Sequence, residues 1–403
     1  MFWVKMPLHK KIFLMIILGA GIGYFMGPDA VKLKPIGDAF IRLLKMLIVP
    51  LVFFTISSGI TKMETPRNLR KIGGFVVTFY ALTSLLAAFI GTVVALTIRP
   101  GQGIEGILGS AKEISVAKYS FVDTILNWIP TNPVAAMANM SMIQIIFFAI
   151  LFGLAILLLG EKAKLMANFV TNGADVMIKI TDFVMSISPY GIGALVAVLV
   201  GTISDKMVLA VIKFIVTDYL SIFIVFISAY PLILRWAKVP VFNFFKTISP
   251  AMLVAATTTS SAATLPISLD IAEHKMGIHP SIFGFALPLG STVNMNGMAV
   301  ALGVISVFSF DIYGFEITPL LLTKVVFLGL VLAVGAAGVK GAGIVMSAVL
   351  FESLNMPLEL VPILAAIWPV IDIAHTTANI TGDLVVTRAC SARLGNKMEK
   401  QKN

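Results

Sequence analysis

Long apolar stretches separated by short polar joints dominate the chain and predict membrane-spanning α-helices. Residues 75–98 and 143–159, for example, contain no charged side chain and are long enough to cross most or all of a bilayer as helices. A membrane β-barrel would instead show short segments of alternating hydrophobicity. The pattern therefore predicts an all-α, polytopic membrane protein.

The joints divide the chain into eight expected spans and two re-entrant hairpins. The spans are predicted at 11–27, 36–61, 73–98, 119–160, 164–203, 207–235, 280–309 and 358–390. The hairpins are predicted at 241–277, which is too polar at its centre for a simple span, and at about 317–354. A polar, Gly-rich outer loop is expected at 100–118.

Two hairpin tips, each followed by a polar stretch inside apolar sequence, suggest an internal repeat. The first tip is rich in Thr and Ser, and the break Asn294–Gly297 follows it; Ser260 and Asn294 are 34 positions apart. The second tip is rich in Gly, and Gly341 and Asn379 are 38 positions apart. Irregular backbone and buried polar groups persist at membrane depth only where they line a cavity, so this arrangement is typical of a transporter built from inverted repeats.

Composition and charge agree with a membrane protein and exclude several other classes. Only 12% of the residues are charged, against about 25% in a soluble domain. The net charge of +10 is concentrated in short loops and at the two ends, which favours the positive-inside rule over nucleic-acid binding and predicts cytoplasmic termini in a plasma or bacterial inner membrane. The single Cys390 excludes an internal disulfide, and no nucleophile–base pair or phosphate loop points to an enzyme or a cofactor.

Four polar residues of the last span form a stripe on one helix face. Asp372 and Asp383 are 11 residues apart, about three turns, and His375 and Asn379 lie between them. A buried carboxylate costs several kcal/mol, so a functional role is favoured over a role as polar glue between helices. Asp218, in another apolar span, is interpreted as a pairing or interface group.

The chemistry of these stretches suits a cation and a carboxylate. Unwound backbone near Asn294 would offer carbonyls that, with Asn and Asp oxygens, suit Na⁺. Hydroxyls and backbone N–H groups at the Ser260-Ser261 tip suit an anion. The Gly-rich second tip is predicted to act as a gate, formed by Val339, Lys340 and Gly341.

Five motifs, in order along essentially the whole chain, resemble the dicarboxylate/amino acid:cation symporters, which include the glutamate transporters and their archaeal homologues. The motifs are Ile129–Pro133 with Phe147–Ile150, Ser260-Ser261 with Thr264–Pro266, Leu287–Gly290 with Asn294-Met295-x-Gly297, Gly338–Gly343, and Asn379–Asp383. The resemblance implies a homotrimer with Na⁺ as coupling ion and no other cofactor. It also implies an elevator mechanism in which scaffold segments 1–72 and 100–204 hold a transport domain made of 73–99 and 205–403.

The resemblance also assigns site residues. It places the substrate among hairpin tips and the last span: Ser260, Ser261, Met298, Gly343, Asp372, His375, Thr376 and Asn379. Asp372 would hold an α-ammonium, and Asn379, Ser261 and backbone near Gly343 an α-carboxylate. Three sodium positions would be formed by Tyr80, Thr83, Ser84, Gly290, Thr292, Asn294, Met295, Asn296, Asn379 and Asp383, with carbonyls of 333–336.

Departures from the family pattern bear on the substrate. His375 stands where acidic-substrate members carry Arg, and Met298 where they carry Thr, which favours a neutral amino acid. Asn296 replaces an aspartate at the third sodium position, and Lys340 is predicted to pair with Asp372 when the site is empty. A protonated His375 could still accept an acidic side chain. The alternatives are a proton- or sodium-coupled symporter of glutamate, aspartate or C4-dicarboxylates with the same fold, and a channel or non-transporting sensor.

Overall fold

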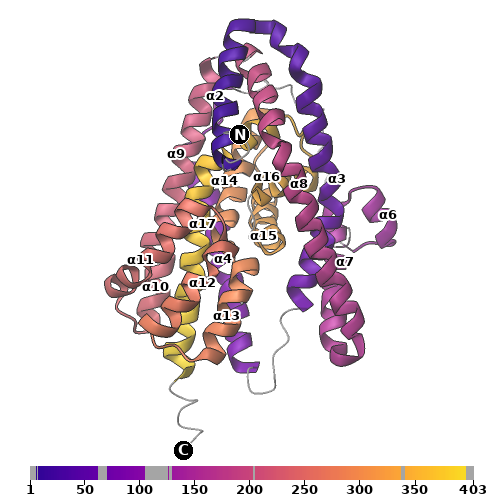
Figure 1. Cartoon of the computed structure of the whole chain (residues 1–403). Coiled ribbons are helices and arrows are strands. Elements are labelled where there is room, and N and C mark those ends of the chain that lie inside the picture. The colour runs from indigo at the N-terminus through magenta and orange to yellow at the C-terminus, as the bar shows by residue number, and fades with distance from the viewer. Residues whose placement is uncertain are drawn as a thin grey trace, which may run out of the picture.

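All regular elements in the described part of the chain are helices. The computed structural model describes residues 6, 8–61, 70–104, 126, 129–202, 205–336 and 341–395 (Figure 1). The elements of the first half are α2 (Leu8–Met26), η1 (Gly27–Leu33), α3 (Lys34–Thr61), α4 (Arg70–Ile98), α6 (Pro133–Ala138), α7 (Met142–Leu159), η2 (Gly160–Ala163), α8 (Lys164–Thr202), α9 (Asp205–Ile227) and α10 (Ala229–Trp236). Those of the second half are α11 (Val241–Thr258), α12 (Ser261–Asp270), η3 (Ile271–Lys275), α13 (Pro280–Val293), α14 (Asn296–Tyr313), α15 (Pro319–Gly335), α16 (Ala342–Ser353), α17 (Val361–Cys390) and η4 (Ser391–Gly395).

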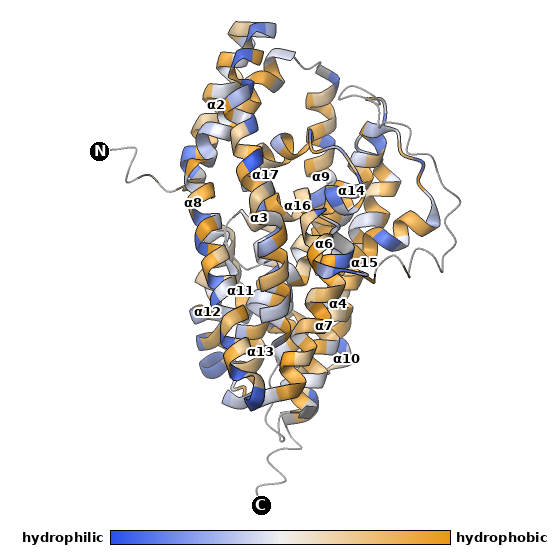
Figure 2. Ribbon diagram, turned by 90° about the vertical axis from the view of Figure 1, so that its right-hand side faces the viewer, coloured by the Kyte–Doolittle hydropathy of each residue, from blue (hydrophilic) through white to orange (hydrophobic). Residues whose placement is uncertain are grey.

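The outer surface of the molecule is apolar, as a bilayer requires. Among the described residues, six continuous helical stretches are long and apolar enough to cross a membrane. Two of them, Lys10–Thr61 and Gln144–Thr202, each contain two long helices. Large apolar side chains such as Phe25, Leu158 and Leu165 are at least 85% exposed, and Figure 2 shows apolar residues over most of the helices. The prediction of a polytopic, all-helical membrane protein is confirmed.

Every expected span lies on one or two helices. The span expected at 207–235 is divided into α9 and α10 at Ser228, and the one at 119–160 contains α6 and α7, with 119–125 outside the described residues. Most of the outer loop expected at 100–118 also lies outside them. The break predicted in the seventh span separates α13 from α14.

Both expected hairpins are pairs of packed helices. α11 and α12 form the first, and Thr259 turns the chain between them with a left-handed backbone (φ 48°). α15 and α16 form the second, and the tip residues between Ala336 and Gly341, including the predicted gate residues Val339 and Lys340, lie outside the described part.

The helices pack in two groups. α3 and α8 pack against each other, with α2 against α8 and α7 against α3. The other group surrounds α14, in which every residue is buried, and includes α4, α9, α15 and α17. Scaffold and transport domains with the boundaries given above stay a prediction.

Candidate functional site

A helix break in the middle of the core is the centre of the candidate site. α13 ends at Val293 and α14 begins at Asn296, while Asn294 (φ −98°, ψ 72°) and Met295 (φ −97°, ψ 65°) leave the helical region. Asn294 and Asn296 are fully buried. The unwound residues therefore place polar side chains and backbone groups in the buried core.

The side chain of Asn294 joins three elements around the carboxylate of Asp383. Its Nδ2 donates to Asp383 Oδ1 at 2.9 Å, and its Oδ1 accepts from Thr83 Oγ1 of α4 at 3.0 Å. The second carboxylate oxygen, Asp383 Oδ2, is buried and has no hydrogen-bond partner among the described residues. A buried carboxylate oxygen with unused lone pairs is a suitable ligand for a hard cation.

Gly290 lets the backbone of α13 approach this carboxylate. A Cβ atom at Gly290 would lie 2.5 Å from Asp383 Oδ1 and 2.6 Å from the hydroxyl of Tyr80. Tyr80 is held in place by donating to the carbonyl of Ala286 at 2.8 Å. The structure thus brings together Tyr80, Gly290 and Asp383, which the resemblance assigned to sodium positions.

A second polar link, through Tyr230 of α10, was not anticipated from the sequence. Asn296 Oδ1 accepts from Ser84 Oγ at 3.0 Å, and Asn296 Nδ2 donates to the Tyr230 hydroxyl at 3.2 Å. Tyr230 in turn donates to the carbonyl of Ala378 at 2.7 Å. This chain of hydrogen bonds ties α4, α14, α10 and α17 together beside the helix break.

The available donor atoms favour an alkali cation over a transition metal. Within the described ranges, no group of three or more His, Cys, Asp or Glu side chains could hold a metal ion. The site offers instead one carboxylate together with amide, hydroxyl and carbonyl oxygens. Such an all-oxygen set suits Na⁺ and lacks the nitrogen and sulfur ligands that zinc prefers.

Thr292 lies at a separate small cavity whose lining is mainly apolar. It lines this cavity together with Thr55 of α3, Asp175 of α8 and Val334 of α15. Thr55 Oγ1 donates to the carbonyl of Gly335 at 3.0 Å. Thr292 and Val334, near the C-terminal end of α15, therefore border one space; that Thr292 and the carbonyls of 333–336 share a sodium ion stays a prediction from the resemblance.

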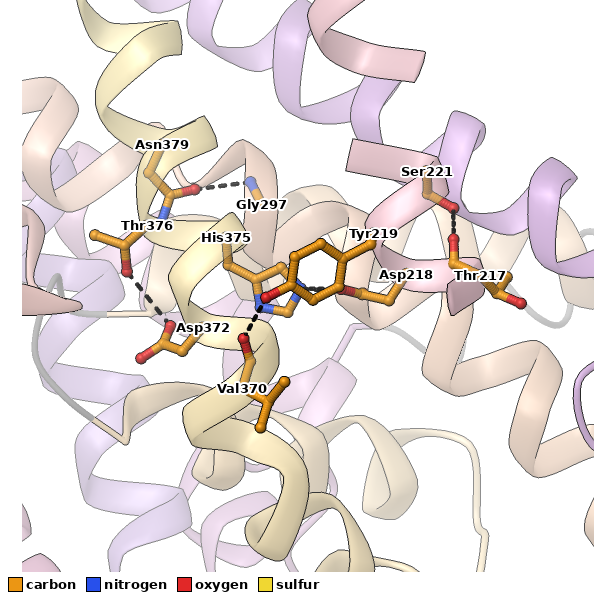
Figure 3. Close-up of polar contacts among 10 residues, drawn as sticks. All are labelled: Thr217, Asp218, Tyr219, Ser221, Gly297, Val370, Asp372, His375, Thr376 and Asn379. Carbon is orange, nitrogen blue, oxygen red and sulfur yellow. Dashed lines mark hydrogen bonds and ion pairs between the residues drawn. The ribbon is translucent and has the colours of Figure 1, made fainter. Parts of the chain in front are cut away.

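Asn379 fixes the start of α14. Its Oδ1 accepts from the backbone N–H of Gly297 at 2.7 Å (Figure 3), and its Nδ2 donates to Met295 Sδ at 3.2 Å. A Cβ atom at Gly297 would overlap the backbone of His375. α14 and α17 consequently touch backbone to backbone at this point.

The tips of both hairpins meet α17 at Asp372. Thr259 of the first tip and Gly341 of the second line a small cavity with Asp372 and Trp368, and α2 and α8 close its other side. Asp372 Oδ1 also accepts from Thr376 Oγ1 at 3.4 Å (Figure 3). Described residues of both tips therefore line one cavity with the polar stripe of α17.

The serines of the first tip start α12. Ser260 is the N-cap, and its Oγ accepts from the backbone N–H of Ala263 at 3.3 Å. Ser261 is the first residue of the helix and is buried. α12 therefore begins at the first tip with a capped N-terminus, and helix N-termini favour anions.

Trp368 is a site residue that the sequence analysis missed. Its indole packs directly on Gly343, where a Cβ atom would overlap the ring. The second hairpin is therefore packed against α17 at this point. Its Nε1 is buried without a hydrogen-bond partner in the described part of the chain. Met298 of α14 is also buried, but it is not among the residues that line the cavity at Asp372.

His375 points away from this cavity and toward α9. Its Nε2 lies 2.8 and 3.0 Å from the two carboxylate oxygens of Asp218 (Figure 3). These distances confirm the predicted pairing of Asp218. The side chains of His375 and Asp218 are 1% and 0% exposed, so the pair lies deep in the core. The sequence signal was an ionisable residue in each of two apolar helices; it did not reveal that they were partners.

Comparison with known proteins shows which transporters the chain resembles. The chain matches the Sodium:dicarboxylate symporter family over residues 8–392. It is 30% identical to the proton/glutamate-aspartate symporter of Bacillus subtilis, over 95% of this chain and 94% of that protein. It is 26% identical to the proton/sodium-glutamate symport protein of Bacillus caldotenax (99% and 96%) and 30% identical to C4-dicarboxylate transport protein 2 of Pseudomonas paraeruginosa (95% and 90%).

Proposed function

Because the chain belongs to the sodium:dicarboxylate symporter family, whose members are transporters and not enzymes, we propose that it couples the uptake of a small acid to cations across a bacterial inner membrane. The proposed substrates are acidic amino acids and C4-dicarboxylates, which the names of the relatives include. The proposed coupling ions are Na⁺ and H⁺: the names of two relatives include the proton, and one of these names also includes sodium.

The observation that carries this proposal is the broken helix beside Asp383. A buried carboxylate oxygen without a hydrogen-bond partner in the described residues, next to unwound backbone, supports a sodium position at Asp383 and Asn294. Asp372 and the two hairpin tips are proposed to hold the substrate. The homotrimer, the cytoplasmic termini and the elevator movement of 73–99 with 205–403 against 1–72 and 100–204 belong to the same proposal.

A neutral amino acid is the second candidate substrate. His375, at the position of the family's Arg, has its Nε2 engaged by Asp218, and Thr259 at the first tip carries no charge. A second substrate carboxylate would then lack a cationic partner among these residues. The names of the relatives give no support to this preference, so we place the acidic substrates first.

Uptake into proteoliposomes of labelled glutamate, aspartate, succinate and serine, under Na⁺ and pH gradients, tests the proposal. Asp372→Asn removes the proposed partner of a substrate α-ammonium group, so it should weaken uptake of amino acids. Uptake of succinate should be unaffected, because succinate has no ammonium group. Cation-driven uptake of any of the three acids supports the first proposal. Uptake of serine alone would replace it with the second, and accumulation without any cation gradient would exclude symport.

A further inference from the structure

The buried pair of His375 and Asp218 links two helices. None of the proposed sodium or substrate contacts requires this pair to be charged. His375 lies on α17 and Asp218 on α9, and the shorter Nε2–carboxylate distance is 2.8 Å. Neither residue lines the cavity at Asp372. The ring contacts described for His375 are Asp218 and, with centroids 5.6 Å apart, Trp368.

Burial makes the charge state of this pair depend on a single proton. An isolated carboxylate in a dry apolar interior is strongly unfavourable. An imidazolium beside Asp218 forms a neutral pair, whereas a neutral imidazole leaves one uncompensated negative charge between α9 and α17. Gain or loss of one proton therefore switches the net charge of the pair between zero and minus one.

The second ring nitrogen is the point at which this proton can be exchanged. His375 Nδ1 is buried and has no hydrogen-bond partner among the described residues. Asp218 engages Nε2 in either state, so the ring keeps its orientation while Nδ1 gains or loses a proton.

Other ionisable groups around the ring are few. On α17, Asp372 lies one turn before His375 and acts on it electrostatically. On α9, the hydroxyl of Tyr219 donates to the carbonyl of Val370 at 2.7 Å. On α2, Lys10 lines the same groove as Val370. Neither α14 over 296–310 nor α16 over 342–351 contains an ionisable residue.

We propose that the His375–Asp218 pair is the proton-binding site of this symporter. The inference rests on the proposed function and names the group that takes up the coupling proton. The proton adds to Nδ1 of the neutral imidazole, and the imidazolium releases it on the opposite side; no other bond forms or breaks. A bound anionic substrate near Asp372 adds negative charge beside the ring and favours the protonated state of His375. Binding of the proton and binding of the substrate therefore favour each other.

Proton uptake per substrate molecule, measured with a pH-sensitive dye inside proteoliposomes in the absence of Na⁺, tests this site. The test uses whichever of the four labelled compounds the protein takes up, so an error in the substrate does not affect it. Asp218→Asn keeps a hydrogen-bond acceptor for Nε2–H but removes the charge, and His375→Gln removes the titrating ring. Asp270→Asn is the matched control, because Asp270 also pairs with a histidine, with 3.0 Å between its Oδ1 and His274 Nδ1, but on the exposed surface.

The expected result is proton uptake with substrate in the wild type and in Asp270→Asn, and its loss in both variants of the pair. Asp218→Asn should retain exchange of external for internal substrate, which shows that it is folded. An unchanged proton-to-substrate ratio in Asp218→Asn overturns the inference. Substrate uptake by the wild type without protons also overturns it, while leaving sodium-coupled symport intact.

A second measurement does not depend on folding of the Asp218 variant. The ¹⁵N-histidine NMR signal of His375, assigned by its absence in His375→Gln, should change between about pH 5 and 8 and shift when substrate binds. A ring that stays in one protonation state throughout this range, with and without substrate, contradicts the proposal.

Discussion

Replacing Gly297 by Ala should loosen the contact that holds the start of α14 on α17. The added methyl group would overlap the backbone of His375, and neither backbone can move without shifting a buried helix. The same shift would lengthen the 2.7 Å hydrogen bond from Gly297 N–H to Asn379 Oδ1. The substitution therefore disturbs the geometry of the helix break as well as the packing.

The expected loss of stability follows from these two contacts. Overpacking of a tight core costs about 1–3 kcal/mol. A weakened buried hydrogen bond adds about 1 kcal/mol. Ala favours helix over Gly by about 1 kcal/mol, which offsets part of the loss. The net prediction is a destabilisation of about 1–3 kcal/mol.

Thermal unfolding of the purified protein in detergent, followed by a thiol-reactive dye that reports exposure of the buried Cys390, measures this loss. The matched control is Gly284→Ala in α13, where a Cβ atom would meet nothing within 4 Å. This control should leave Tm unchanged or raise it slightly. Unfolding of Gly297→Ala at the same temperature as Gly284→Ala would show that α14 and α17 do not touch backbone to backbone at Gly297.

Two further substitutions test other parts of the structure. Asp383→Asn removes the charge of the proposed sodium ligand, and the Na⁺ concentration for half-maximal uptake should rise at least about tenfold, or about 1.4 kcal/mol; an unchanged Na⁺ dependence would exclude Asp383 as a ligand. Arg99→Ala deprives the buried carboxylate of Asp311 of its 2.6 Å partner and should lower stability by about 1–3 kcal/mol, a value reduced because Arg99 is 40% exposed. Lys32→Ala, at an exposed ion pair, should leave Tm within error, and equal effects of the two substitutions would refute the role of burial.

Local patterns in the sequence were sufficient to locate most helices and the irregular points between them. The Thr- and Ser-rich tip lies at Thr259, and the polar interruption in the seventh span lies at Asn294 and Met295. These features are visible because apolar runs and helix-breaking residues act over a few neighbouring positions. The boundaries of α8 and α17 also lie close to the expected ones for this reason.

Contacts between distant segments could not be read from the same patterns. The pairing of His375 with Asp218 spans 157 positions, and the link from Asn296 to Tyr230 joins helices that are not consecutive. Periodicity shows which face of a helix is polar but not which helix it meets. Trp368 was missed because an aromatic residue in an apolar span looks like ordinary core, and only the structure shows that it covers Gly343.

The most direct test of cation-coupled acid transport is accumulation of labelled glutamate or succinate in proteoliposomes that contain only this protein, with an inward Na⁺ or proton gradient and with none. We expect accumulation above the external concentration that disappears when the cation gradients are collapsed by ionophores. Accumulation that persists after collapse, or movement of these acids only down their own gradient, would contradict it.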